Sequence, residues 1–332
     1  MRYFAVPEFL DGEVGQNPVY LDCVSEKTFS VMRRVGGLAQ LSSEQADEYM
    51  GAVLEVGPDS IEPSLLNKAS NASTRTWLTF MVSDVRDEDG QVNIPATFIS
   101  LGPAPIEGEA VTLFISRPEP LDSETQAAVE RVFDASRLAL RSFERFTKLL
   151  EKLFAPEGRR HVVAYHVGQG NCNAVVDEYE HPVLFFDLGW PIQTNIAGAP
   201  NPPPRLFDVE TDAGPAPVVL SHWDWDHWAY ALESWRYDRS RGAPVVKWKP
   251  TALDRPWLVP APEKASKLGP SHHLLILKLY QQRFEGRRAL HFWPRGKTVW
   301  ETENLTLVKC ATQKKRRFIS QQFGVGHGSA YR

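Results

Sequence analysis

Two histidines and two aspartates lie within six consecutive positions of the chain, at His222, Asp224, Asp226 and His227. Imidazole nitrogens and carboxylate oxygens are common protein ligands of zinc, iron and manganese. Alternation along a loop lets His222 and Asp224 face one way, and the adjacent Asp226 and His227 can serve a second ion. Two such ions about 3.5–4 Å apart share one bridging water. The spacing therefore predicts a site for one or two divalent ions, with zinc first and manganese or iron as alternatives.

The chemistry that such a site favours is hydrolysis. A divalent ion lowers the pKa of its water to about 7, which supplies a nucleophile at neutral pH. We expect Asp226 to orient the attacking water or to accept its proton. The plain alternative is a polar surface loop in which Asp226 caps the next turn. Because Trp223, Trp225 and Trp228 also occupy this stretch, and a solvated turn has no need of them, metal binding is the favoured interpretation.

The elements around the loop are a predicted strand and a predicted helix. The run from Pro217 to Leu220 is too short for a helix and is β-branched, which is typical of a buried strand. The stretch from Trp228 to Trp235 is predicted to begin a helix. A loop that follows a strand lies at the carboxyl edge of a sheet, where α/β proteins place their chemistry.

Three more strands are predicted upstream, at residues 162–167, 173–176 and 183–186. The first two are joined by the turn Gly168-Gln169-Gly170-Asn171, and the third ends at Asp187-Leu188-Gly189. Glycines in that turn allow the backbone to pack closely beneath the metal loop. We expect Asp187 to brace the loop through hydrogen bonds rather than to bind an ion.

These motifs resemble those of the metallo-β-lactamase fold family. Its second motif is His-x-His-x-Asp-His, and here Asp224 replaces the second histidine, which favours harder metals. The turn Val-Gly-Gln-Gly-Asn at 167–171 is similar to the Val-Gly-Gln-Gly-Asp turn of the competence-type (ComEC-like) branch. The resemblance covers roughly residues 160 to 310. It implies an α/β protein with an αββα sandwich, short at its C-terminus, that hydrolyses a phosphodiester or a related ester in a nucleic acid or a small molecule.

The family also uses a further histidine ligand beyond the loop. The candidates are His272 and His273, at the start of a helix predicted to run to about Arg283, and the resemblance places His272 in the metal set. A helix-capping or exposed histidine is the alternative at both positions. His327 begins a His-Gly-Ser similar to a late motif of the same branch.

Composition excludes several classes of protein. The chain has 332 residues, of which 42% are hydrophobic and 23% charged, which is typical of globular proteins. A net charge of −4 provides no general attraction to nucleic acid or membranes. Cys23, Cys172 and Cys310 are an odd number without a close pair, which argues for a reducing compartment, and we expect the cytoplasm. A signal peptide and a membrane span are not expected.

The organisation predicted from these patterns has three parts. Residues 1–120 form an N-terminal domain of unassigned function, small and α+β or β-rich. Residues 121–156 form an amphipathic connecting helix or a broken pair of helices, because apolar residues recur at three- and four-residue steps. Residues 157–332 form the metallo-β-lactamase-like domain. The stripe on the connecting helix is expected to pack between domains, with partner binding as the alternative.

A second function is consistent with the same sequence. The replaced histidine, the short C-terminal half and the large extra domain favour a module that is catalytically weak or inactive. Such a module would act as an interaction protein in a multi-component system, and would contact a protein partner through the N-terminal domain or the connecting helix.

Overall fold

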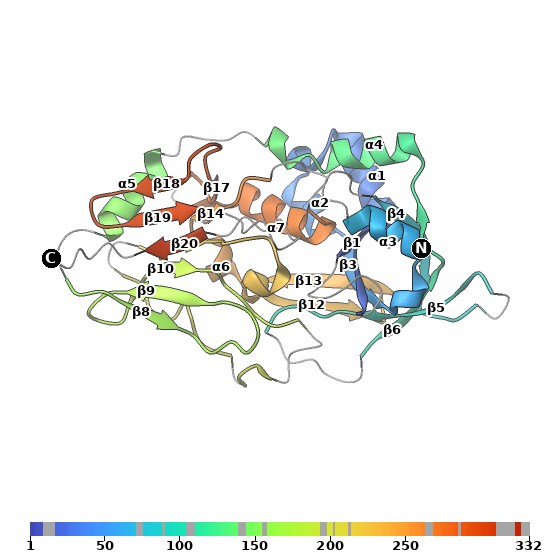
Figure 1. Cartoon of the computed structure of the whole chain (residues 1–332), viewed down its shortest axis with the longest axis horizontal. Coiled ribbons are helices and arrows are strands. Elements are labelled where there is room, and N and C mark those ends of the chain that lie inside the picture. Colours follow the sequence, from blue (N-terminus) through green and yellow to red (C-terminus); the bar gives the residue numbers. More distant parts are fainter. Residues whose placement is uncertain are drawn as a thin grey trace.

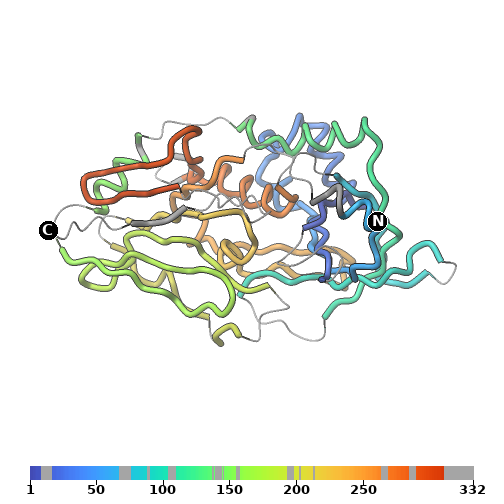
Figure 2. The backbone as a smooth tube through the Cα atoms, in the orientation of Figure 1, coloured from blue at the N-terminus to red at the C-terminus, as the bar shows by residue number. Residues whose placement is uncertain are grey.

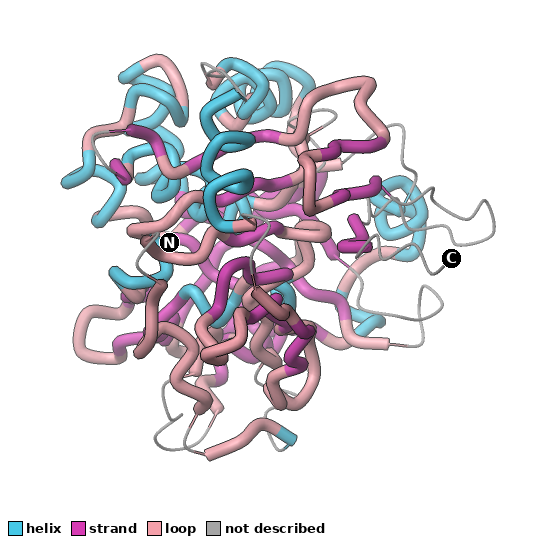
Figure 3. Tube along the Cα trace, turned by 90° about the vertical axis from the view of Figure 1, so that its left-hand side faces the viewer, coloured by secondary structure: helices cyan, strands magenta, loops and turns pink. Residues whose placement is uncertain are grey.

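The computed structural model describes residues 1–8, 17–70, 76–87, 90–103, 110–138, 144–154, 158–192, 198–201, 203–211, 214–262, 268–284, 287–309 and 323–326. Its helices are α1 (Glu26–Val35), α2 (Ser43–Asp47), α3 (Pro63–Ser70), α4 (Ser123–Val132), α5 (Glu144–Leu153), α6 (Pro250–Leu253) and α7 (Pro270–Gln281). Seen along the long axis of the molecule, the strands occupy the centre and most helices lie on their upper side (Figure 3). No described helix is long and apolar enough to cross a membrane.

The first half of the chain closes into a six-stranded antiparallel barrel (Figure 1). Around the barrel its strands are β1 (Arg2–Glu8), β2 (Val19–Ser25), β3 (Gly51–Val56), β5 (Val92–Phe98), β6 (Thr112–Ser116) and β4 (Leu78–Ser83). Pairing of β4 with β1, with Phe80 opposite Tyr3, closes the ring. A short strand, β7 (Glu119–Pro120), extends the pairing of β4. Strand β2 is buried along its whole length, which later places one of its carboxylates deep inside the protein.

The second half of the chain builds one mixed six-stranded sheet. Figure 2 shows the blue first part of the chain on the right and most of the yellow-green to red second part on the left. The order of the sheet is β17 (Leu290–Phe292), β14 (Trp257–Val259), β11 (Val218–Val219), β10 (Pro182–Phe186), β9 (Asn173–Val176) and β8 (His161–Ala164). The first four of these run parallel, and β9 and β8 are antiparallel to their neighbours. The predicted buried strand before the metal loop is confirmed, because Val218 and Val219 are almost fully buried.

Both faces of the mixed sheet are covered by apolar side chains. Val218 packs into the core shared with the barrel, whereas Val219 points to a second core. That second core is formed with α5 and with the hairpin β18 (Val299–Glu301) and β19 (Thr306–Lys309). Strand β20 (Phe323–Gly326) pairs with β19, and β15 (Arg283–Phe284) pairs with β16 (Arg287–Arg288). Burial on both faces explains the continuous apolar runs of these strands.

Helix α7 joins the barrel to the mixed sheet. It contacts β2 and β3 on one side and β17 on the other. All its residues from Pro270 to Leu279 are buried, so it lies inside the protein rather than on its surface. The N-terminal turn of α7 therefore lies between the barrel and the loops of the sheet.

The predicted αββα sandwich is wrong. Such a sandwich needs a second sheet that faces the first, but β14 joins the same sheet as β11. Strand β13 (Ala243–Trp248) pairs with β12 (Leu232–Asp238), in a separate two-stranded sheet. The closed barrel and α7 occupy one face of the only large sheet in the described second half. The helix predicted from Trp228 is also wrong, because Leu232 and Trp235 lie on strand β12, and Trp235 bridges to Leu101 beside the barrel.

The predicted connecting helix is two helices, α4 and α5, in the described residues. Val129 and Phe133 pack into the core of the barrel side, and Phe146 and Leu150 pack under the mixed sheet. The apolar stripe is thus used for internal packing at these positions. The predicted boundary at 155–157 lies outside the described residues.

Candidate metal centre

The loop that holds the predicted ligands follows β11 and ends at β12. Its backbone is held by the segment that follows β10: Leu188 N donates to His227 O at 2.9 Å, and Tyr230 N donates to Leu188 O at 3.0 Å. Two glycines allow this approach: a Cβ on Gly170 would lie 2.4 Å from Asp226 O, and one on Gly189 would lie 2.3 Å from it. The predicted close packing of the glycine turn beneath the loop is confirmed.

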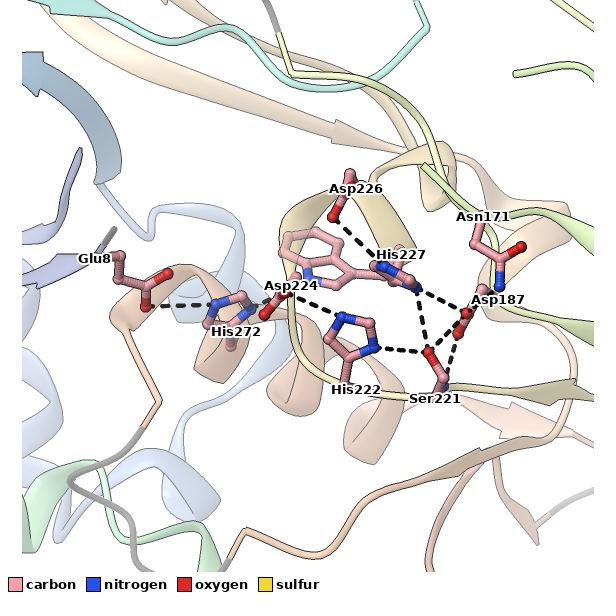
Figure 4. A network of polar contacts seen from close by, with 10 residues as sticks. Glu8, Asn171, Asp187, Ser221, His222, Asp224, Asp226, His227 and His272 are labelled. Atoms are coloured by element: carbon pink, nitrogen blue, oxygen red, sulfur yellow. Dashed lines mark hydrogen bonds and ion pairs between the residues drawn. The ribbon is translucent and has the colours of Figure 1, made fainter. Parts of the chain in front are cut away.

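Asp187 is the centre of a buried hydrogen-bond network (Figure 4). Its carboxylate accepts from Ser221 N at 2.6 Å and from Ser221 Oγ at 2.7 Å. Asn171 Nδ2 donates to the same carboxylate at 3.0 Å. The backbone of Asp187 is left-handed, with φ 62°, which is uncommon outside glycine and is held here by these bonds. The prediction that Asp187 braces the loop is confirmed.

The two loop histidines are oriented by this network through the same ring atom. Nδ1 of His227 lies 2.8 Å from Asp187 Oδ2, and Nδ1 of His222 lies 2.8 Å from Ser221 Oγ. The ring centroids of the two histidines are 3.7 Å apart. Both Nε2 atoms then face the loop carboxylates, at 3.0 Å from Asp224 Oδ2 for His222 and at 3.7 Å from Asp226 Oδ1 for His227.

Solvent reaches this group from one side. The side chain of Asp224 is 59% exposed and that of Asp226 is 25% exposed, whereas His222 and His227 are 11% and 16% exposed. The carboxylates thus form the open side of the group and the imidazoles its buried side.

The charges of the group act on one another. Desolvation tends to raise the pKa of Asp224, but the hydrogen bond from His222 and the charge of the histidines outweigh it, so that this pKa lies below its ordinary value. Burial raises the pKa of Asp226, helped by Asp224 and opposed by His227. Burial tends to lower the pKa of His227, but the hydrogen bond and charge of Asp187 raise it above its ordinary value.

The four loop residues come together as two pairs, His222 with Asp224 and His227 with Asp226. Within the described residues, the group of three whose donor atoms all lie within 4.8 Å of one another is Glu8, Asp22 and His272. Asp22 is fully buried on β2, and burial followed by the charge of Glu8 raises its pKa to about 7. Glu8 and His272 of this group lie beside the loop in Figure 4. The sequence prediction that His272 completes the loop site stays a prediction.

His273, the other candidate for the further ligand, faces the core. Its Nδ1 lies 2.9 Å from Gly269 O, and its ring packs against Phe133 with centroids 5.0 Å apart. The third candidate motif, which begins at His327, lies outside the described residues.

The three loop tryptophans pack inward. Each indole N–H has a partner: Trp223 donates to Pro260 O, Trp225 to Ser271 Oγ, and Trp228 to His272 Nδ1. All three side chains are buried. They anchor the loop to the protein.

Sequence reasoning missed the residues that link the loop to the barrel. The sequence could have indicated Asp22, because it is a carboxylate inside the apolar run Val19–Ser25. A buried charge in a strand needs partners. Nothing in the sequence around Glu8 indicates its role, because closure of the barrel is what brings it close to His272. Ser221 had a weak signal in its position next to His222.

No protein-family model, curated protein or solved structure matches this chain. The resemblance to the metallo-β-lactamase family therefore rests on the residues of the glycine turn and the metal loop alone.

Proposed function

We propose that the loop binds one or two divalent metal ions, zinc first and manganese or iron as alternatives, and that the protein is a metal-dependent hydrolase. The ligands would be His222, Asp224, Asp226 and His227. We do not include His272 in this set, because its Nδ1 already accepts a hydrogen bond and its Nε2 faces Glu8.

One observation carries the proposal: both imidazoles are held through Nδ1 and present Nε2 to carboxylates. Metal-binding histidines commonly donate their other N–H to a carboxylate or a similar acceptor, which fixes the tautomer and orients the ring. Asp187 accepts in this way from His227 Nδ1 at 2.8 Å. A carboxylate buried beneath two histidines, with two more carboxylates on the open side, matches the donor set that zinc and manganese use.

The residues of this chain would have different roles in the hydrolysis. A bound divalent ion supplies Lewis acidity and acidifies a water. Asp226, partly buried and with a raised pKa, would orient the attacking water or accept its proton. Asp187 would keep the imidazoles in place without contacting substrate, and Asp224 would lie at the entrance.

The substrate we propose is a phosphodiester or a related ester. This choice rests on the likeness of the turn Gly168–Asn171 to the competence-type branch, and the accessible side of the site at Asp224 supports entry of an external ligand. The compartment we propose is the cytoplasm, and Cys23 and Cys172 are free and buried, as suits a reducing environment.

The test is a joint measurement of bound metal and turnover on the full chain. Protein stripped with a chelator is reloaded with zinc, manganese or ferrous iron, and metal per chain is measured beside hydrolysis of bis-p-nitrophenyl phosphate and of a lactone. We expect at least one ion per chain and faster phosphodiester hydrolysis. Asp226→Ala and His227→Ala should lower both readouts together, whereas Asp208→Asn, at an exposed carboxylate paired with Arg205, should change neither.

Three results would count against the proposal. Less than half an ion per chain in folded protein would favour the alternative, an interaction module without catalysis. Full activity in both loop variants would remove their assigned roles. Faster hydrolysis of the lactone than of the phosphodiester would keep the metal centre and reject the substrate class.

A further inference from the structure

His272 lies between the candidate metal loop and the barrel, and its two ring nitrogens have different neighbours (Figure 4). Nδ1 lies 3.1 Å from the indole Nε1 of Trp228, which belongs to the loop. Nε2 lies 3.6 Å from Oε1 of Glu8 on β1, and His272 belongs to the group of three with Glu8 and Asp22. The imidazole is 3% exposed, so these protein contacts, and not bulk water, decide its state.

The contact with Trp228 fixes the position of the proton on His272. An indole N–H can only donate, so Nδ1 must accept and carries no proton. The proton of the neutral imidazole is then on Nε2, where it faces the carboxylates. Neither ring nitrogen has a lone pair left for a cation, which argues against His272 as a ligand both in the loop site and in the group with Glu8 and Asp22.

The buried carboxylate of Asp22 has its own donors. Its oxygens accept from Ser271 N at 3.0 Å and from Ser271 Oγ at 2.6 Å, in the first turn of α7. The N-terminus of a helix of this length carries partial positive charge. These donors lower the pKa of Asp22 and offset part of the effect of its burial.

The same turn of α7 reaches the loop twice. Ser271 Oγ accepts from Trp225 Nε1 at 2.7 Å, and His272 Nδ1 accepts from Trp228 Nε1. The ring of His272 also stacks on Trp225, with centroids 5.8 Å apart and planes at 18°. Trp228 directly follows His227 in the chain, so the bond to His272 anchors the loop one residue from a proposed ligand.

We propose that His272 is a positioning residue which, as the Nε2–H tautomer, links Trp228 to the carboxylates of β1 and β2 and holds the metal loop against the barrel. The tautomer of His272 and its link between Trp228 and the barrel are inferred from the contacts above. Their effect on metal affinity rests on the proposed function of the loop.

The first test is the protonation state of the ring. Full-length protein labelled with ¹⁵N in histidine is studied by long-range ¹H–¹⁵N correlation at neutral pH, before and after zinc, with His272 assigned by substitution. We expect an unprotonated Nδ1 and a protonated Nε2 on His272, unchanged when zinc shifts the Nε2 signals of His222 and His227. A zinc-induced loss of the His272 Nε2 proton, or an Nδ1–H tautomer in zinc-free protein, overturns the proposal.

The second test separates positioning from ligation. His272→Leu removes both contacts, whereas His272→Asn places an amide oxygen near Nδ1 to accept from Trp228. We expect His272→Leu to keep the number of ions per chain but to weaken zinc binding about 10- to 100-fold, the usual effect of losing a residue that orients ligands. His272→Asn should recover part of that loss. One ion fewer per chain in either variant would make His272 a ligand and overturn the proposal.

Two further measurements decide the proposal if the first variants fail to fold or the protein binds no zinc. If His272→Leu fails to fold, Trp228→Phe removes only the indole donor and should give a mixture of His272 tautomers; a pure Nε2–H state there would overturn the link. If wild-type protein binds no zinc, the proposed function fails, yet the zinc-free spectra still decide the tautomer.

Discussion

The carboxylate of Asp187 lies 2.8 Å from Nδ1 of His227, and it holds Ser221, whose hydroxyl lies 2.8 Å from Nδ1 of His222. One buried side chain at the end of β10 thereby orients both imidazoles of the candidate metal centre. The two strands involved, β10 and β11, are parallel neighbours, so their carboxyl ends bring Asp187 and Ser221 together.

Asp187→Asn should damage the metal centre without touching a ligand. The amide would present an N–H where carboxylate oxygens now accept from Ser221 and His227, so a buried donor would lose its partner. We expect zinc affinity to fall about 10- to 100-fold and the free energy of unfolding to fall by about 2–4 kcal/mol. Calorimetric titration with zinc and urea unfolding measure the two effects, with Asp208→Asn as the control. Unchanged affinity would separate Asp187 from the site.

The local part of this arrangement was predictable from the sequence. A short apolar run ending at Ser221, a glycine turn and Asp187-Leu188-Gly189 are signals within a few residues of one another, and the structure confirms the buried strand, the close glycine packing and the brace at Asp187. These features depend on short-range sterics and on hydrogen bonds across neighbouring strands, which sequence patterns report well.

The global arrangement was not predictable in the same way. Closure of the barrel depends on β4 pairing with β1, which are distant in sequence. From its sequence alone, the stretch after Trp228 is predicted to be helical. In the structure Trp235 forms a β-bridge with Leu101, and its indole N–H donates to Gly51 O. Tertiary contacts of this kind override local propensity, and they also replaced the expected second sheet with the barrel.

Gly189→Ala should displace the metal loop by simple overlap. Its Cβ would lie 2.3 Å from Asp226 O and 2.5 Å from Asn171 N, both of which are backbone atoms that cannot rotate away. We expect a loss of about 1–3 kcal/mol in unfolding free energy together with weaker zinc binding. Gly198→Ala is the matched control, because a Cβ there meets nothing within 4 Å. Equal behaviour of the two variants in thermal unfolding and zinc titration would contradict the close packing described for Asp226.

Ser271→Ala should weaken the junction between the barrel and the loop. The hydroxyl accepts from Trp225 Nε1 and donates to Asp22 Oδ2, at 2.7 and 2.6 Å. Its removal leaves a buried indole N–H and a buried carboxylate each short of a partner, which costs about 2–4 kcal/mol. Ser240→Ala deletes an exposed hydroxyl bonded to Asp238 and should stay within about 0.5 kcal/mol of wild type. Urea unfolding followed by tryptophan fluorescence compares them, and similar midpoints for both variants would show that the junction contributes little.

His291 should make the fold sensitive to acid at a place remote from the metal loop. It lies on β17 with its ring 5.0 Å from that of Phe146 on α5, and burial lowers its pKa from 6.5 to about 4. Between these two values the unfolded chain binds a proton that the folded chain does not, so stability falls as the pH drops from about 6.5 to about 4. The full effect of such a shift is about 3 kcal/mol.

His291→Gln isolates this contribution, because glutamine does not titrate. At pH values above the ordinary histidine pKa the variant should be less stable than wild type, since it packs less well against Phe146. Towards pH 4 the difference should shrink by about 3 kcal/mol, because only in wild type does the unfolded chain gain a histidine proton that the folded chain does not bind. Urea unfolding of both proteins across this range gives the difference at each pH, in which the other titrating groups cancel. Parallel stability curves for the two proteins would show that His291 is as free to protonate in the folded chain as in the unfolded one.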